Sequence, residues 1–477
     1  MEYEEFLKQK SQLDGNYGFD PLFMPDYLFD FQKALVEWAL KKGKAALFED
    51  CGLGKTIQEL VIAQNIVEKT NKNVLILAPL AVSYQFVSEG EKFDIEVKRS
   101  TNGKPTGKIT VTNYEKLHLF DSNDYIGVIC DESSILKHFG GSTQKHVTRF
   151  MSKMPYRILA TATPSPNDFY ELGTSSEAVG SLSHSEMLSR FFNQTDNKSF
   201  RSDEIKLLKN AHKPGKYFAK LAYRTAQTIS GWKLKPHADQ PFWKWVCSWA
   251  RACRMPSELG FDDNGFILPN LEQKDYIVIP KTPPDGYLFT PEVFGLNQER
   301  DERRRTMDER CEIVAKLADT GDFVFIGCHL NPEGDLIENL IPGSVQVAGK
   351  HTDEEKEERL LGFAKGDFKV LITKPKIGAW GLNYQHCNHV ISFATHSYEQ
   401  YYQLIRRCWR FGQKRPVRVD VVFTEGEKGV RNNMQRKADA ADQMFSKLIK
   451  YMDEAMWLEK TQYNTKVEVP LWLSASN

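Results

Sequence analysis

The chain has 477 residues, which is enough for about three domains at roughly 150 residues each. Basic and acidic side chains both number 63, so the formal net charge is zero. This balance excludes a uniformly basic nucleic-acid coat protein, but it allows a nucleic-acid binder whose positive charge is confined to one cleft.

The sequence lacks the features of a membrane or secreted protein. No apolar run reaches the ~18 residues that a membrane-spanning helix requires. The acidic start MEYEEF does not have the charged-then-apolar order of a signal peptide. The eight cysteines are scattered without a C-x-x-C pair, so neither a zinc ribbon nor a disulfide framework is indicated. We therefore expect a cytoplasmic protein in a reducing compartment, with no membrane partner.

Short apolar runs, each followed by turn residues and a helical stretch, occur in two blocks. The first block predicts strands at 45–48, 74–78, 109–112, 128–130 and 158–160. The second block predicts strands at 323–326, 344–347, 370–372, 390–393 and 418–423. Because strands that alternate with helices form parallel sheets, we expect an α/β fold with two such sheets.

The stretch between the blocks has a different pattern. Residues 171–275 look helical and contain a cluster of Trp243, Trp245 and Trp249 next to basic residues. Such aromatic side chains can stack on bases, but they more often form the core of a small helical insertion, which we favour. The basic cluster at 303–305 is interpreted as a solvated helix face. The expected domains are a first α/β unit at 1–170, the insertion at 171–275, a second α/β unit at 276–430, and a short helical tail at 431–477.

The strongest single signal is the segment AALFEDCGLGKTIQELVIA, in which a strand leads into a glycine-containing turn and a helix. Gly52 and Gly54 allow the backbone to curl so that its N–H groups face phosphate oxygens. Lys55 can reach the β- and γ-phosphates of a nucleotide, and the Thr56 hydroxyl can bind Mg²⁺. The segment departs from the usual phosphate-loop pattern at Glu49, where a glycine is expected.

A second strand ends in two acids, as a phosphate-loop nucleotide site requires. The run 127–130 leads directly to Asp131 and Glu132. Asp131 would hold Mg²⁺ through its ligand shell, and Glu132 would orient or deprotonate the attacking water. An apolar run that ends in Asp-Glu is by itself an ordinary strand end, so this signal depends on the phosphate loop before it.

A basic segment near the end of the second block, HSYEQYYQLIRRCWRFGQKR, predicts a helix from a Ser397–Gln400 capping box to Gly412. The predicted buried face consists of Tyr401, Leu404, Ile405 and Cys408. Gln403, Arg407 and Arg410 form a different stripe of this helix. Guanidinium groups held on a rigid helix can cross a cleft and stabilise charge on a transferred phosphoryl group, although a solvated basic face is the alternative.

Together these segments resemble a superfamily-two helicase core, specifically the Swi/Snf-type translocase ATPases, relatives of the DEAD/DEAH-box enzymes. The matching segments, in chain order, are FQKALVEW, DCGLGKT, LILAPLAVSYQF, VTNYEKL, VICDESSILKH, ILATATPSPNDFYEL, FVFIGCHL, KIGAWGLNY and QLIRRCWRFGQKRPVRV. They extend over about 30–423 in the order of the family. The resemblance implies two RecA-like parallel-sheet lobes that bind ATP and Mg²⁺ between them, with a helical insertion and a short helical C-terminal tail.

The resemblance also assigns roles to individual residues. Gln32 would recognise the adenine edge, and Thr161 and Thr163 would couple the nucleotide state to nucleic-acid contacts. The phosphates and Mg²⁺ would be held by Gly52, Leu53, Gly54, Lys55, Thr56 and Asp131. Glu132 would serve hydrolysis, Gly381 and Asn383 would line the cleft from the second lobe, and Arg407 and Arg410 would be the arginine fingers. Weaker candidates for nucleic-acid contacts are Thr112, Asn113 and Lys376, because hydroxyls at strand ends are more often turn formers.

Some positions depart from the family pattern. The acid motif reads DESS rather than DEAH or DEGH, so Ser133 and Ser134 stand in place of a small residue and a histidine. Trp409 replaces the usual histidine, and Pro375 replaces a usual threonine or serine. None of these changes removes a group that hydrolysis needs, and we expect an active ATP hydrolase.

The function that the resemblance implies is a DNA-stimulated ATPase that translocates on duplex DNA. A helicase that separates strands on single-stranded DNA or RNA remains open, as does an ATP-binding switch or scaffold gated by a partner. The chain carries no chromodomain, bromodomain or nuclease motif, so it resembles compact phage and bacterial versions of the core. We expect a monomer in a bacterial or infected-host cytoplasm, with a separate nuclease or replication protein as a plausible partner.

Overall fold

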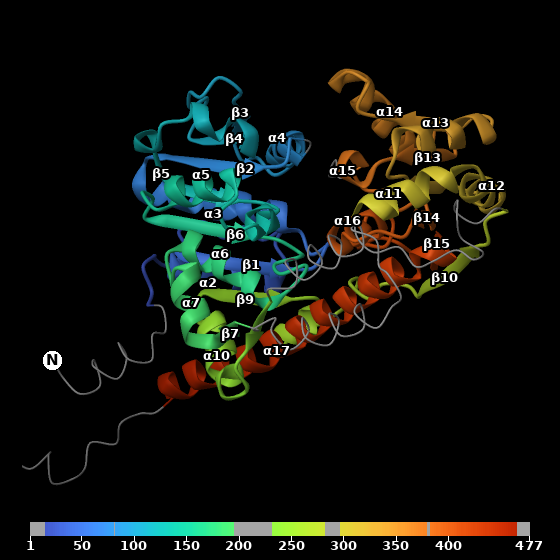
Figure 1. Cartoon of the computed structure of the whole chain (residues 1–477). Coiled ribbons are helices and arrows are strands. Elements are labelled where there is room, and N and C mark those ends of the chain that lie inside the picture. Colours follow the sequence, from blue (N-terminus) through green and yellow to red (C-terminus); the bar gives the residue numbers. More distant parts are fainter. Residues whose placement is uncertain (1–14, 81, 195–230, 282–295, 379–381, 465–477) are drawn as a thin grey trace, which may run out of the picture.

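The protein folds into two α/β lobes connected by a long helix (Figure 1). The structure is a computed structural model that describes residues 15–80, 82–194, 231–281, 296–378 and 382–464. Each lobe is built on a parallel sheet flanked by helices, which confirms the predicted fold class. Within these ranges, no helix is both long and apolar enough to cross a lipid bilayer.

The first lobe contains a seven-stranded sheet in the order β3-β4-β2-β5-β6-β1-β9, in which every neighbouring pair is parallel. Its strands are β1 (Lys44–Glu49), β2 (Asn73–Ala78), β3 (Val97–Arg99), β4 (Ile109–Asn113), β5 (Tyr125–Cys130), β6 (Tyr156–Ala160) and β9 (Ala250–Cys253). Its helices are α2 (Asp30–Lys42), α3 (Lys55–Thr70), α4 (Val82–Lys92), α5 (Ser142–Met151), α6 (Leu172–Val179), α7 (His184–Phe191) and α10 (Asp239–Trp249). The strands predicted for the first block are all present.

The second lobe contains a six-stranded parallel sheet in the order β10-β15-β14-β11-β13-β12. Its strands are β10 (Leu271–Val278), β11 (Val324–Gly327), β12 (Val345–Val347), β13 (Val370–Thr373), β14 (His389–Phe393) and β15 (Val417–Thr424). Its helices are α11 (Leu296–Arg305), α12 (Met307–Ala318), α13 (Asn331–Leu340), α14 (Asp353–Lys365), α15 (Pro375–Gly378) and α16 (Tyr398–Ile405). The predicted strands of the second block are likewise confirmed.

The stretch 171–275 supplies helices, as predicted, and also strands. Trp243 and Trp249 of α10 are fully buried in the core of the first lobe, so the tryptophans are core residues and do not present their faces to bases. β9 pairs with β1 as an edge strand of the first sheet, whereas β10 pairs with β15 of the second. A short antiparallel pair, β7 (Phe192–Gln194) with β8 (Trp232–Leu234), lies near α10.

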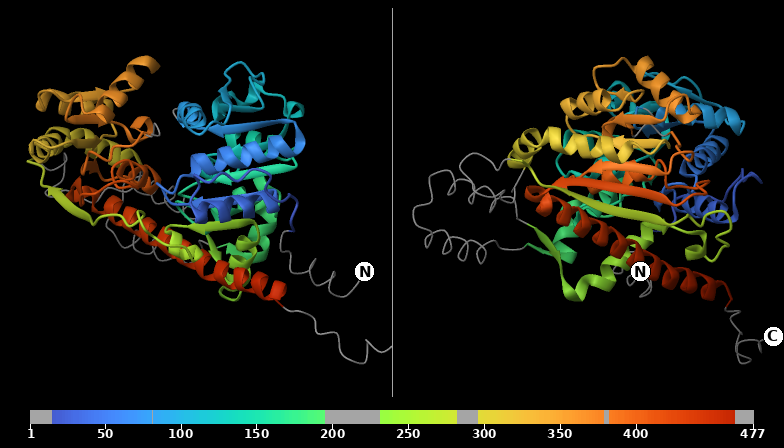
Figure 2. Two further views of the ribbon diagram at one scale, coloured as in Figure 1. Left: turned by 180° about the vertical axis from the view of Figure 1, so that it is seen from behind. Right: turned by 90° about the vertical axis from the view of Figure 1, so that its right-hand side faces the viewer.

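The C-terminal helix α17 (Lys428–Asn464) has 37 residues, which confirms a helix in the tail predicted at 431–477. Val430 and Met434, near its start, are buried in the core of the second lobe. Met444, Phe445 and Leu448, further along, are buried in the core of the first lobe. Figure 2 shows this helix running along both lobes. The helix therefore connects the two hydrophobic cores directly.

The interpretation of 303–305 as a solvated face is wrong for Arg303. This side chain is buried and forms ion pairs with Glu299 and, at 3.0 Å, with Glu427. The partner Glu427 is far away in sequence, so the local charge pattern could not reveal it. Burial of a guanidinium group is tolerated because its hydrogen bonds to carboxylates replace those to water.

Candidate active site

The phosphate loop joins the carboxyl end of β1 to the start of α3. Gly52 (φ 95°) and Gly54 (φ 79°) have left-handed backbone conformations that residues with a side chain rarely adopt. A β-carbon at Gly54 would come within 2.5 Å of Gln32 Nε2, and one at Gly52 within 3.0 Å of the Phe411 backbone nitrogen. The loop therefore needs glycine at both positions for conformation and for space.

Lys55 begins α3 and turns back over the loop. Its Nζ donates hydrogen bonds to the carbonyl oxygens of Glu49 at 2.9 Å and Asp50 at 3.1 Å. Burial acts to lower the pKa of Lys55, but the negative groups around it, among them Cys51 and Glu132, outweigh this effect and the pKa is raised. The ammonium group thus stays charged and available for phosphate oxygens.

The two acids follow β5 directly, as the sequence predicted. Asp131 N donates to Leu77 O at 2.8 Å, and the Tyr114 hydroxyl donates to Asp131 O at 2.5 Å, so the backbone at this strand end is fixed. Burial, reinforced by the charge of Glu132, raises the pKa of Asp131 to about 7. Glu132 has φ 50°, which is rare for a residue with a side chain and typical of functional positions.

These acids fit a divalent cation. Burial raises the pKa of Glu132, and its Oε2 atom is buried without a hydrogen-bond partner among the described residues. A magnesium ion at Asp131 would offset the cost of two buried negative charges, and carboxylate oxygens are the ligands that Mg²⁺ prefers. The Thr56 hydroxyl lines the same cavity as Asp131 and Glu132.

A third acid, which was not predicted from the sequence, lies near Asp131. Glu59 of α3 is fully buried, and burial together with the charge of Asp131 raises its pKa well above the ordinary value. Glu49 is also buried, which raises its pKa to about 7, and its carboxylate accepts a hydrogen bond from Gln58 Nε2 at 2.7 Å. The sequence did contain one signal that Glu59 is buried. It stands among residues that face the sheet, directly before Leu60 and Val61.

The second lobe brings its predicted arginines to the same place. Arg407 and Arg410 line one cavity of about 300 Å³ together with Lys55, Asp131 and Glu132. Asn383 and Gln403 line it as well. Burial and the nearby Arg407 charge lower the pKa of Arg410 to about 10, and Arg410 Nε is buried with no partner in the described parts of the chain. Such converging cations fit an anionic phosphate chain.

The prediction that these arginines lie on a helix is wrong. Ser397 caps α16 by accepting from Gln400 N at 3.4 Å, but the helix ends at Ile405. Arg407 and Arg410 lie in the turns that follow, where Tyr384 N bonds to Arg407 O at 2.8 Å. The sequence retains helical spacing here, but in the structure the Arg407 carbonyl bonds to a residue outside the helix. The predicted buried face of Tyr401, Leu404, Ile405 and Cys408 is confirmed.

Aromatic side chains surround the other end of the cavity. Phe266 contacts Phe29 and Phe411, with ring centroids 5.1 and 4.9 Å apart. Gln32 lies beneath them, where its Nε2 donates to Leu53 O at 2.8 Å and its Oε1 accepts from Phe29 N at 3.0 Å. The amide of Gln32 therefore bonds to the phosphate loop, and the rings form an apolar surface at this end of the cavity. These phenylalanines were not among the residues predicted from the sequence.

Of the remaining predicted residues, Thr112, Asn113, Thr161 and Thr163 do not line this cavity. Asn113 Oδ1 accepts from Lys116 N at 3.2 Å and so forms a turn, while the neighbouring Thr112 is buried. Thr161 Oγ1 accepts from Thr163 N at 3.1 Å, and Thr163 lines a separate cavity with Asp50. Lys376 lies in α15, and Gly381 is outside the described residues.

One segment that contributes residues to the cavity matches a known protein domain. Residues 336–412, which include Asn383, Arg407 and Arg410, match the helicase conserved C-terminal domain. The chain is 28% identical over 180 residues to the DNA annealing helicase and endonuclease ZRANB3 of Mus musculus, covering 33% of this chain and 17% of that protein. It is 28% identical over 178 residues to the SWI/SNF chromatin-remodeling complex subunit snf22 of Schizosaccharomyces pombe, covering 32% of this chain and 10% of that protein.

Among solved structures, the chain is similar to the Sulfolobus solfataricus SWI2/SNF2 ATPase core in complex with dsDNA, with a TM-score of 0.38, 17% identity, and coverage of 91% of this chain and 96% of that one. The matches to the two curated relatives extend over less than a fifth of either protein. The helicase domain and these relatives confirm that the chain resembles the superfamily-two, Swi/Snf-like helicases.

Proposed function

We propose that this protein hydrolyses ATP between its two lobes and uses the hydrolysis to move on nucleic acid, mostly on duplex DNA. The observation that carries the proposal is the shared cavity, where Lys55 and Glu132 of the first lobe meet Arg407 of the second. A site completed by both lobes makes hydrolysis depend on their relative position, which is the requirement for coupling chemistry to motion.

Each group in the cavity has a role that suits its chemistry. The backbone N–H groups of the phosphate loop and Lys55 would bind the phosphates. Asp131 and Thr56 would hold Mg²⁺, which when bound neutralises charge on phosphate oxygens. Glu132 would orient the attacking water and accept its proton, a task that its raised pKa supports. Arg407 and Arg410 would stabilise the charge that develops on the transferred phosphoryl group.

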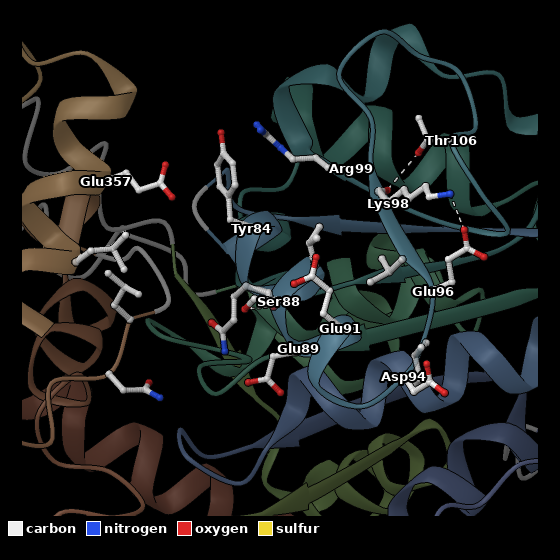
Figure 3. A pocket seen from close by; sticks show the side chains of 18 residues that line it. Tyr84, Ser88, Glu89, Glu91, Asp94, Glu96, Lys98, Arg99, Thr106 and Glu357 are labelled. Atoms are coloured by element: carbon white, nitrogen blue, oxygen red, sulfur yellow. Dashed lines mark hydrogen bonds and ion pairs between the residues drawn. The ribbon is translucent and has the colours of Figure 1, made fainter. Parts of the chain in front are cut away.

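The space for movement lies beyond this cavity. A larger cavity of about 1230 Å³ separates the outer parts of the lobes, and Gln85, Glu89 and Asn383 line both cavities. Figure 3 shows Glu357 on α14 at one side, and Tyr84 and Arg99 on the first lobe at the other. Closing this gap would shift one lobe along a bound strand relative to the other.

DNA is the favoured track because the relatives that align with the chain are a DNA annealing helicase and a chromatin-remodeling subunit. Phosphate contacts supply most of the affinity of such proteins for DNA, so binding should be largely independent of sequence and sensitive to salt. Strand separation on single-stranded DNA or RNA, and a partner-gated switch, are the alternatives that an assay must separate.

The test is steady-state ATP hydrolysis by the wild type and by Lys55→Ala, without nucleic acid and then with duplex DNA, single-stranded DNA or RNA at two salt concentrations. We expect duplex DNA to stimulate the wild type most, less at high salt, and Lys55→Ala to be inactive. Preferential stimulation by single strands or RNA would favour the helicase alternative. A wild type that binds ATP but responds to no nucleic acid would contradict the motor and favour the switch.

A further inference from the structure

One face of α16 and the turn after it contacts the first lobe through polar side chains. Glu399, Tyr402 and Arg406 are spaced i, i+3 and i+7, which places them along one side of a helix. All three bond to residues of the first lobe that flank the nucleotide cavity. Arg406 directly precedes the predicted arginine finger Arg407.

At the start of the helix, Glu399 binds the segment that follows the two acids. Ser134 Oγ donates to Glu399 Oε1 at 2.5 Å, and Lys137 Nζ forms an ion pair with Glu399 Oε2. The side chains of Lys137 and Glu399 are 16% and 14% exposed, so water screens this pair little. Ser134 is one of the residues that depart from the family pattern, and its hydroxyl makes the contact between lobes.

At the other end of this face, two side chains of the second lobe bond to the carboxylate of Asp50. The Arg406 guanidinium forms an ion pair with the Asp50 carboxylate, and the Tyr402 hydroxyl donates to it. Asp50 lies within the phosphate loop, and its carbonyl oxygen accepts from Lys55 Nζ at 3.1 Å. The second lobe is thus bonded to the same residue that holds the catalytic lysine.

The two lobes are in contact at α16 but are widely separated elsewhere. The outer parts of the lobes, at α4 and α14, are kept apart by the cavity of about 1230 Å³, while α16 is bonded at both of its ends. A buried ion pair is costly to break one partner at a time, because the remaining charge is left without compensation. The α16 contact is therefore the fixed point about which the outer parts can approach.

We propose that Asp50, Ser134 and Lys137 are positioning residues that dock α16 on the first lobe through Glu399, Tyr402 and Arg406. The docked helix holds Arg407 and Arg410 toward the phosphate loop while the outer parts of the lobes open and close. This inference rests on the proposed function, because it gives the arginines their task. Glu399 and Lys137 do not line the nucleotide cavity, so they act through the position of α16 and, for Glu399, also through its charge, which helps to raise the pKa of Glu132.

The experiment uses a charge exchange at the pair that lies outside the cavity. Lys137→Glu and Glu399→Lys are each expected to lower kcat for ATP hydrolysis about tenfold or more, with KM for ATP changed by less than about threefold, because displaced arginines weaken the transition state more than substrate binding. The double exchange Lys137→Glu with Glu399→Lys should restore most of the lost rate. Lys350→Ala, which removes an exposed ion pair with Asp335, is the matched control and should behave as wild type.

A second readout does not depend on activity. Fluorophores placed by noncanonical amino acids at the exposed positions Lys72 and Lys414 report the distance between the lobes. Each single charge reversal should lengthen or broaden this distance without nucleotide, and the double exchange should return it to the wild-type value. Thermal unfolding of every variant verifies that the lobes remain folded.

The outcomes separate the two claims. If the wild type hydrolyses no ATP under any condition, the proposed function fails, and the distance measurement alone decides the docking. If the wild type is active but the single reversals keep its kcat and its distance, or if the double exchange restores neither, the positioning role is overturned.

Discussion

Gly52 of the phosphate loop lies against the backbone of Phe411 in the second lobe, so closely that a β-carbon would come within 3.0 Å of the Phe411 nitrogen. Gly52 is thus needed both for the conformation of the loop and for the contact between the lobes. Phe411 follows Arg410 directly, so this contact fixes the distance between the loop and the arginine.

The first prediction uses this contact. Gly52→Ala should destabilise the fold by about 1–3 kcal/mol because of its positive φ, and it should also lower ATP hydrolysis strongly because the β-carbon pushes the second lobe away. Gly343→Ala is the matched control, since Gly343 has φ 80° but no atom within 4 Å of an added β-carbon. Urea unfolding should show similar losses for both variants, and hydrolysis should fall only for Gly52→Ala. Equal activity of the two variants would refute the role of the contact.

A second prediction concerns the arginines. Arg407→Ala and Arg410→Ala should each lower kcat by roughly 10³-fold, the range measured for arginine fingers, with binding of a fluorescent ATP analogue little changed. Arg415→Ala removes an exposed guanidinium of the same segment and should be nearly neutral. Single-turnover hydrolysis and equilibrium binding distinguish the two effects. Loss of binding without loss of kcat would mean that these arginines stabilise the bound substrate and not the transition state.

A third prediction concerns pH and Glu49. Because burial raises its pKa to about 7, the folded protein keeps this carboxyl protonated up to a pH at which the unfolded chain has already released the proton. The folded state then binds more protons between about pH 4.5 and 7, so stability falls as pH rises through this window. The contribution is on the order of 3 kcal/mol.

Glu49→Gln cannot ionise and should therefore lose less stability over the same window, which chemical unfolding at several pH values would measure. The amide can keep a hydrogen bond with Gln58, so the comparison isolates the charge. Parallel curves for wild type and variant would show that Glu49 ionises normally in the folded protein.

A fourth prediction concerns the aromatic end of the cavity. Phe411→Ala should raise KM for ATP about tenfold, in line with the ~1–3 kcal/mol that a base gains by stacking on an aromatic ring. Every base has a face to stack, so KM for GTP should rise by a similar factor. Phe139→Ala, which removes another exposed ring that stacks on His184, serves as control. An unchanged KM would place the base elsewhere.

The parts of the site that were predictable from sequence are those in which local chemistry dictates the pattern. The phosphate loop needs Gly52, Gly54 and Lys55 in fixed order, and Asp131 must follow an apolar strand, so neighbouring residues suffice to find them. The ten predicted strands were found for the same reason, since each is a short apolar run bounded by turns, whereas β3, β9 and β10 were not predicted.

What the sequence could not reveal depends on partners far apart along the chain. In the turn that follows α16, Arg407 O accepts a hydrogen bond from Tyr384 N, and the buried Arg303 pairs with Glu427. Phe266 reaches the cavity only because the stretch between the lobes folds back against Phe29. The β9 strand was missed because Ala250–Cys253 contains an arginine and two alanines, which carry no strand signal.

Movement on duplex DNA is the central claim, and displacement of a third strand from a DNA triplex measures it most directly. With ATP, the wild type should release the third strand, while Lys55→Ala and Arg407→Ala should not, and release should slow at high salt. ATP hydrolysis that duplex DNA stimulates, without any release of the third strand, would contradict translocation.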